Sequence, residues 1–277
     1  MSYKRVLSIQ DISCVGQCSL TVALPILSAC GHETAIIPSA VLSTHTGGFE
    51  GKFTFRDLSD DIPAINQHWI KAGIKFDAIY TGYLGSVKQI AMVMDIMKTV
   101  GNPGCKNIVD PAMADNGKLY VGFDQKYVDA MKSLCGVADI LLPNITEAAF
   151  LTDSEYKEIY DEAYIDMLLE KLTKLGARAV ILTGVSFKSD KTGVMVYNNG
   201  SKSYYEHKKI SKGSHGTGDI YASAFVGALL REKSMFDSAK IAADYTVKCI
   251  ENTYQDASHW YGAKFETAIP DLIEMLK

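Results

Sequence analysis

Short apolar runs alternate with longer segments of helical periodicity along most of the chain. The runs predict six strands, at residues 5–9, 33–37, 78–81, 107–110, 140–142 and 179–182. Between them apolar residues recur at helical spacing, for example over residues 20–27, 90–97 and 165–172. Because repeated strand–helix–strand units are typical of a parallel sheet with helices on both faces, we expect an α/β fold.

Two later runs, at residues 193–197 and 202–206, flank Asn198-Asn199-Gly200 and predict an antiparallel hairpin added to that sheet. Alternating Lys, Phe, Thr, Phe and Arg at residues 52–56 predict a small lid strand. The C-terminal third is mostly helical in pattern. Because no repeat, low-complexity tract or linker interrupts the pattern, we expect one domain over residues 1–277.

Composition narrows the classes of partner. The chain has 28 basic and 32 acidic residues, a net charge of −4, which disfavours nucleic acid and membrane surfaces as partners. No apolar run approaches the roughly 18 residues of a membrane span, and residues 6–9 are too short for a signal peptide, so we expect a cytoplasmic protein. Six scattered cysteines predict free thiols rather than a disulfide scaffold or a zinc site.

Polar residues follow five of the predicted strands. They are Gln10 to Ser13, Gly82-Tyr83, Asp110, Asn144 and Thr183-Gly184. Open parallel sheets bind ligands at the carboxyl ends of their strands. Any one polar strand end is equally well explained by contact with solvent, but five together predict a binding cleft.

The sharpest local motif is the glycine-rich segment from Gly213 to Asp219, which precedes an apolar stripe at helical spacing. Such a turn exposes backbone N–H groups at the positive end of the helix dipole and so favours an anion. The spacing is neither that of a Walker A loop nor that of a Rossmann fingerprint. Asp219 is either a favourable acidic residue in a first helical turn or a general base for a hydroxyl that attacks phosphorus. We expect the helix dipole to keep it ionised.

Two further carboxylates lie at neighbouring strand ends. Asn144 and Glu147 have the spacing of a capping box, which is a purely structural role. Alternatively Glu147 organises Mg²⁺ through water, with Asp110 as its partner, because two carboxylates that face a triphosphate require a cation between them. Residues 110–120 then form a polar loop with an Asn116-Gly117 turn that can move over the site.

The polar loop at residues 43–49 carries hydroxyls, glycines and His45. It suits recognition of a polar ring, although an ordinary surface loop has the same composition. Tyr83 can stack on such a ring or fill the core.

Taken together, these segments resemble the ribokinase-like superfamily, on its pyridoxal/pyridoxine kinase branch. Gly216-Thr-Gly-Asp219 before a helix carries the superfamily resemblance, and His45-Thr-Gly47 and Thr81-Gly-Tyr83 carry the branch. The resemblance extends over nearly the whole chain. Its other segments are Arg5-Val-Leu-Ser-Ile-Gln10, Val109-Asp-Pro111 and Leu142-Pro-Asn-Ile-Thr-Glu147.

The resemblance implies ATP- and Mg²⁺-dependent phosphorylation of the 5′-hydroxymethyl group of pyridoxal, pyridoxine or pyridoxamine, a step of vitamin B6 salvage, by a homodimer that pairs through its lid. It also implies a role for each matching residue. For the transfer step, Asp219 would be the base, Gly216, Thr217 and Gly218 would hold the phosphoryl group, and Asp110 and Glu147 would organise Mg²⁺. For ATP, Asn144 and Thr183 would contact the phosphates, Asp115 would lie in the loop over the site, and residues 207–212, including Lys209, would border the adenine. For the vitamer, Thr46 and Tyr83 would contact the ring, with His45 nearby.

Three positions depart from the vitamin B6 kinases. Asp11 replaces the usual Ser, and it would accept a hydrogen bond from the substrate or bind an amine. Ala114 replaces a glycine of the mobile loop. His215 resembles hydroxymethylpyrimidine kinases, but those often end the motif in Cys, whereas this chain has Asp219. The alternatives are therefore a hydroxymethylpyrimidine or sugar kinase, and a non-catalytic nucleotide-binding protein on the same fold.

Overall fold

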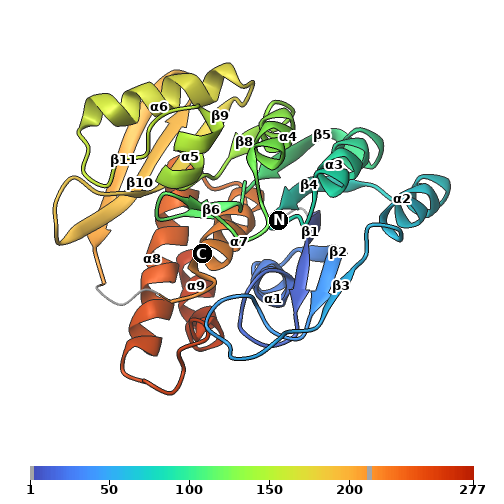
Figure 1. Cartoon of the computed structure of the whole chain (residues 1–277), viewed down its shortest axis with the longest axis horizontal. Helices are drawn as coiled ribbons and strands as arrows, with labels where there is room; N and C mark the ends of the chain where they lie inside the picture. Colours follow the sequence, from blue (N-terminus) through green and yellow to red (C-terminus); the bar gives the residue numbers. More distant parts are fainter. Residues whose placement is uncertain (1–2, 211–213) are drawn as a thin grey trace.

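The computed structural model describes residues 3–210 and 214–277, which build one nine-stranded sheet and a separate two-stranded hairpin (Figure 1). The strand order is β11-β10-β9-β8-β5-β4-β1-β2-β3. Pairs from β9 to β2 are parallel, and β11, β10 and β3 add antiparallel edges. The strands are β1 (Arg5–Ser13), β2 (Glu33–Leu42), β3 (Phe55–Asp57), β4 (Phe76–Thr81), β5 (Gly101–Val109), β8 (Ile140–Leu141), β9 (Ala179–Val185), β10 (Lys191–Asn198) and β11 (Ser201–Lys208). The predicted mostly parallel α/β sheet is confirmed.

Helices cover both faces of the sheet because successive strand residues point to opposite sides. In β1, Leu7 and Ile9 pack into the core beneath α2 to α6, whereas Val6 packs into the core beneath α1, α7, α8 and α9. The helices are α1 (Leu20–Ala29), α2 (Ile62–Lys71), α3 (Val87–Thr99), α4 (Gln125–Cys135), α5 (Ile145–Leu151), α6 (Glu162–Lys174), α7 (Thr217–Leu230), α8 (Met235–Tyr254), the 3₁₀ turn η1 (Phe265–Ala268) and α9 (Ile269–Met275).

In each of two hairpins, an Asn-Gly turn joins the two strands. β10 and β11 are joined at Asn199 and Gly200, with φ of 49° and 83°. The small pair β6 (Ala114–Asp115) and β7 (Lys118–Leu119) is joined at Asn116 and Gly117, with φ of 50° and 75°. Positive φ at both turn positions matches the twist of the flanking strands. Both turns are therefore where the sequence predicts them.

The edge near β3 differs from the prediction. β2 continues five residues beyond the predicted 33–37, through Pro38 to Leu42, and β3 begins at Phe55 rather than at residue 52. β3 pairs only with residues 40–42 of β2. Position 38 therefore borders an open sheet edge, where proline removes no ladder bond on that side.

Two other sequence expectations concern thiols and membranes. All six cysteines are free, as predicted. Within residues 3–210 and 214–277, no helix has both the length and the apolarity that a bilayer crossing requires.

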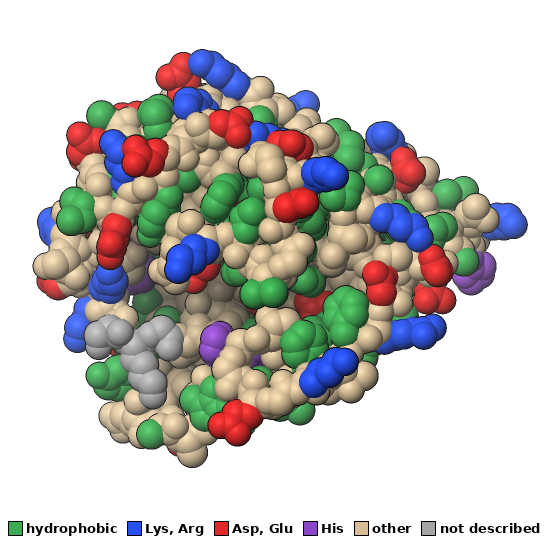
Figure 2. Space-filling view, viewed as in Figure 1, with side chains coloured by type: hydrophobic (Ala, Val, Ile, Leu, Met, Phe, Trp, Pro, Cys, Tyr) green, Lys and Arg blue, Asp and Glu red, His purple; other side chains and the backbone are tan. Residues whose placement is uncertain are grey.

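The parallel arrangement brings the carboxyl ends of β1, β4, β5, β8 and β9 to one edge of the sheet. β11 runs in the same direction as β9, because each is antiparallel to β10, so its end at Lys208 lies at the same edge. The face shown in Figure 2 is hollowed near its middle, with a histidine at the rim of the hollow.

Candidate active site

The glycine-rich turn opens α7 as an anion site. Gly216 is the N-cap in the left-handed conformation (φ 75°), and the first helical bond is donated by Ile220 to its carbonyl. The N–H groups of residues 217–219 therefore have no helical acceptor. A Cβ at Gly216 would lie 2.0 Å from the carbonyl oxygen of Gln17, whereas a Cβ at Gly218 would meet no atom within 4 Å. Gly216 is required by packing, and Gly218 borders the open cleft. Gly213 lies outside the described residues.

Asp219 follows this turn and is held by a distant backbone group. The N–H of Ser19, at the end of the β1–α1 loop, donates to Oδ2 of Asp219 at 2.9 Å. Burial raises the pKa of Asp219 to about 7, against the Ser19 bond, which lowers it. The expectation that the helix dipole keeps this carboxylate ionised is therefore wrong. Desolvation of the charge raises the pKa by more than the surrounding hydrogen-bond donors lower it. A carboxyl with a pKa near neutrality suits a general base.

Asp11, at the end of β1, lies in the same corner but has partners within the chain. Its Oδ1 accepts from the Ser19 hydroxyl at 2.5 Å, and its Oδ2 accepts from the Ser13 hydroxyl at 3.0 Å. The side chain is buried, and burial raises its pKa. The structure thus engages both oxygens of the carboxylate that sequence reasoning gave to the substrate.

Asp110 and Glu147 bring two more buried carboxyls to this edge. Asn144 and Glu147 form the predicted capping box, with both bonds at 2.9 Å, and Glu147 also accepts from the N–H of Met113 at 3.1 Å. Burial raises the pKa of Glu147 to about 7. The pKa of Asp110 lies well above its usual range because of burial and then the charges of Glu147 and Asp219.

This acidic group fits a cation that binds together with an anionic ligand. None of the ion pairs found in the described residues involves Asp110, Glu147 or Asp219. Among residues 3–210 and 214–277, no three His, Cys, Asp or Glu side chains lie close enough together to bind a metal ion by themselves. A cation here would therefore need oxygens from water or from a phosphate as well.

The residues expected to meet ATP lie along the same edge. Asn144, which follows β8, forms an isolated parallel bridge with Thr183 in β9. Asn144 donates its side-chain amide to the carbonyl of Ala114, which ties it to the β6–β7 hairpin that carries the exposed Asp115. Lys209 follows β11 and is exposed, and residues 211 and 212 lie outside the described part. The structure thus brings these four predicted residues to one edge.

The loop at residues 43–53 packs against His215 in the glycine-rich turn before α7. The rings of His45 and His215 lie 4.7 Å apart, and a Cβ at Gly47 would meet the imidazole of His215 at 2.7 Å. His45 Nδ1 accepts from the N–H of Gly47 at 3.0 Å, so its Nε2 carries the proton and donates to the carbonyl of Tyr261 at 2.7 Å. Both ring nitrogens of His45 are thus engaged in holding the loop, and burial lowers its pKa.

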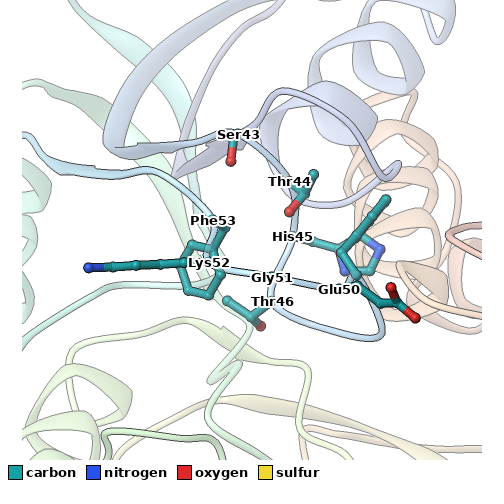
Figure 3. A pocket seen from close by; sticks show the side chains of 9 residues that line it. Ser43, Thr44, His45, Thr46, Glu50, Gly51, Lys52 and Phe53 are labelled. Atoms are coloured by element: carbon teal, nitrogen blue, oxygen red, sulfur yellow. The ribbon is translucent and has the colours of Figure 1, made fainter.

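A pocket of about 120 Å³ lies in this loop and is shown in Figure 3. Thr46 and Phe53 line it, and the side chains of Glu50 and Lys52 point to opposite sides. The volume is well below the roughly 300 Å³ of a pocket that encloses a whole ligand. It is therefore a marginal hollow of the loop rather than the complete substrate site.

A sequence profile of the phosphomethylpyrimidine kinases matches residues 29–262. The chain belongs to this family. It is therefore a kinase, an ATP-dependent phosphotransferase, as the glycine turn and its carboxylate suggest.

Relatives of this kinase cover nearly its whole length. A pyridoxal kinase from Dictyostelium discoideum is 28% identical over 82% of this chain and 79% of its own. A solved structure of a pyridoxal kinase from Lactobacillus plantarum is 31% identical with a TM-score of 0.91, covering 99% of this chain and 98% of its own. A protein from Bacteroides thetaiotaomicron, assigned to the phosphomethylpyrimidine kinases and crystallised with pyridoxal, is 34% identical with a TM-score of 0.92 over 98% and 96% of the two chains. These matches confirm the ribokinase-like resemblance and its vitamin B6 branch.

Sequence reasoning about this kinase missed Ser19 and the aromatic residues of the 255–264 loop. Phe49 packs against Trp260 with ring centroids 4.8 Å apart. No spacing rule connects residue 19 to residue 219, or residue 49 to residue 260. Tyr83, which sequence reasoning placed on a substrate ring, lies 5.5 Å from the ring of Phe123 in a stacked arrangement, so part of its surface fills an aromatic cluster.

Proposed function

We propose that this kinase transfers the γ-phosphoryl group of ATP to the 5′-hydroxymethyl group of pyridoxal, pyridoxine or pyridoxamine. The single observation that carries the proposal is Asp219, a carboxyl with a pKa of about 7 beside the open N–H groups of α7. A base of this pKa next to an anion site suits an alcohol that attacks phosphorus. The vitamin B6 assignment is supported by near full-length similarity to pyridoxal kinases.

In the proposed reaction the hydroxyl oxygen of the vitamer forms a bond to the γ-phosphorus, and the bond to the ADP oxygen breaks. Asp219 takes the hydroxyl proton on Oδ1, since Ser19 already binds Oδ2. The N–H groups of Gly216, Thr217 and Gly218 hold the phosphoryl oxygens throughout. Because phosphoryl transfer depends mainly on positioning and charge stabilisation, these groups provide most of what the step needs from the protein.

Asp110 and Glu147 would hold Mg²⁺ through water. Burial raises both pKa values, and the charge of Glu147 raises that of Asp110 further, so that a cation would relieve this repulsion. When bound, Mg²⁺ supplies positive charge that neutralises the phosphate oxygens. Asn144 and Thr183 would bind the ATP phosphates, Asp115 and Lys209 would flank the nucleotide, and Thr46 and Tyr83 would border the ring.

The test is an ADP-release assay with the three vitamers and hydroxymethylpyrimidine, with the phosphorylated product identified by mass. We expect at least one vitamer to give the highest kcat/KM, and Asp219→Asn to lower the turnover about 10²–10⁴-fold. Hydroxymethylpyrimidine is the second candidate, favoured by His215 in the glycine-rich turn and by the family match. A kcat/KM for hydroxymethylpyrimidine above that of every vitamer would establish this alternative.

The proposed assembly is a homodimer that acts in the cytoplasm without nucleic acid or membrane partners. The exposed Phe53 and Phe55 beside the open edge of β3 support pairing through the lid. Light scattering at micromolar concentration tests it, and a mass of one chain would contradict it.

A further inference from the structure

Ser19 has an unusual backbone conformation for a residue with a side chain. Its φ is 56° and its ψ is −131°, a region that glycine adopts freely and other residues avoid. Such a conformation is strained and persists only where neighbouring groups enforce it. Ser19 is also only 5% exposed, so the surrounding structure rather than solvent determines its geometry.

The hydroxyl of Ser19 is not used as serine usually is at this position. Ser19 is the N-cap of α1, and its carbonyl accepts from the N–H groups of Val22 and Ala23. An N-cap serine normally accepts a further helix N–H with its hydroxyl. Here the side chain makes no such cap and instead donates to the buried carboxylate of Asp11.

Two contacts through Ser19 connect β1 to the start of α7, and a third, within β1, holds Asp11. Ser13 donates to Asp11, Asp11 accepts the Ser19 hydroxyl, and the Ser19 N–H donates to Asp219. The bond to Asp11 fixes the side chain of Ser19 while its backbone turns toward Asp219. The result is that one oxygen of Asp219 is tied down and the other remains for a proton.

We propose that Ser19 and Asp11 are positioning residues, which hold Asp219 in the orientation that accepts the substrate proton. The inference rests on the proposed function, because it assigns the base role to Asp219. It replaces direct contact of Asp11 with the vitamer by an action through Ser19.

The two residues can be separated with paired substitutions. Ser19→Gly removes the hydroxyl but adopts the positive φ without strain, whereas Ser19→Ala removes the hydroxyl and keeps the strain. Asp11→Asn keeps an oxygen that accepts the Ser19 hydroxyl, whereas Asp11→Ala does not. Ser234→Ala is the matched control, because Ser234 is the N-cap of α8 and caps the N–H of Asp237.

We expect kcat to fall about 10–100-fold in Ser19→Ala and Asp11→Ala, the scale for a displaced reacting group, with KM for vitamer and ATP unchanged. Ser19→Gly and Asp11→Asn should recover at least part of that loss. Ser234→Ala should lower the melting temperature without changing kcat. These measurements are made on the full-length protein, and thermal unfolding shows that each variant is folded.

Two results would overturn the inference. One is a kcat in Ser19→Ala equal to or above that of Ser19→Gly, which would indicate packing alone. The other is an increase in KM for pyridoxamine alone in Asp11→Ala, which would indicate direct contact with an amine. If the wild type phosphorylates hydroxymethylpyrimidine and no vitamer, the proposed substrate fails, while the same kcat comparison on hydroxymethylpyrimidine still decides the positioning role.

Discussion

Replacing Asp219 with Asn tests both the electrostatics and the chemistry of the site. The pKa of this carboxyl rises from an ordinary 3.8 to about 7, and burial is the main cause. A folded state with a raised carboxyl pKa binds more protons than the unfolded chain between these values. Its stability therefore falls as the pH rises from about 4 to 7, and the full penalty is present above pH 7.

The size of the penalty follows from the same two values. At about 1.36 kcal/mol per pKa unit, ionised Asp219 costs the folded state at most about 4 kcal/mol above pH 7. The side chain keeps some exposure, and Asn retains an oxygen for the Ser19 N–H. We therefore expect Asp219→Asn to stabilise the ligand-free protein by about 1–3 kcal/mol at pH 8 and by less at pH 5.

The assay is thermal unfolding of the ligand-free wild type and variant at pH 5 and pH 8, where each kcal/mol shifts the melting temperature by about 2–4 °C. Asp95→Asn, which removes an exposed carboxylate of α3, is the control and should show no such difference. Turnover of Asp219→Asn should fall about 10²–10⁴-fold. The reasoning would be refuted if the difference in melting temperature between variant and wild type were the same at pH 5 and pH 8. It would also be refuted if the variant kept wild-type turnover.

Three other outcomes are expected. The kcat/KM of the wild type should fall as the pH drops below about 7, because Asp219 must be ionised to accept a proton, and a rate that is constant from pH 8 to pH 5.5 would exclude this. Gly216→Ala should have a lower melting temperature and a lower turnover, because its Cβ would lie 2.0 Å from the carbonyl oxygen of Gln17. Gly218→Ala should fold normally and raise only the KM for ATP, because its Cβ would meet no atom within 4 Å. Glu147→Gln, which loses the charge and keeps an acceptor for only one of the N–H groups of Asn144 and Met113, should raise the Mg²⁺ concentration for half-maximal rate about 10–100-fold, measured by titrating Mg²⁺ at saturating ATP.

The sheet could be predicted because its strands are short, apolar and separated by helical periodicity. Ile181 packs on one face and Val180 and Leu182 pack on the other, so the apolar run 179–182 has no polar side to obscure it. The Asn-Gly turn at Gly200 was equally clear, since few residues tolerate its backbone. β2 was underestimated because Pro38 ordinarily ends a strand, and the open edge that tolerates it is a property of the sheet.

The site was predictable only as far as local chemistry reaches. The glycine turn before Asp219 and the capping box at Glu147 are encoded within a few residues each. The pKa of Asp219 was not predictable, because desolvation depends on the packing of the whole cleft. The hydrogen bonds of His45 to two backbone groups were not predictable either, because one of them is made to Tyr261 in the distant 255–264 loop.

The buried carboxyls lower the stability of the ligand-free fold and, for the same reason, favour binding of a cation at this edge of the sheet. Asp110, Glu147 and Asp219 all have raised pKa values, which means that their ionised forms are unfavourable in the ligand-free folded protein. In the proposed reaction, a cation bound with ATP would relieve the repulsion, and a proton from the substrate would neutralise Asp219. Replacing these residues with neutral ones would stabilise the fold and remove the reason for it to bind a cation, which is the usual conflict between stability and activity at an active site. The strained backbone of Ser19 belongs to the same pattern, since its energetic cost is tolerated where it orients the base.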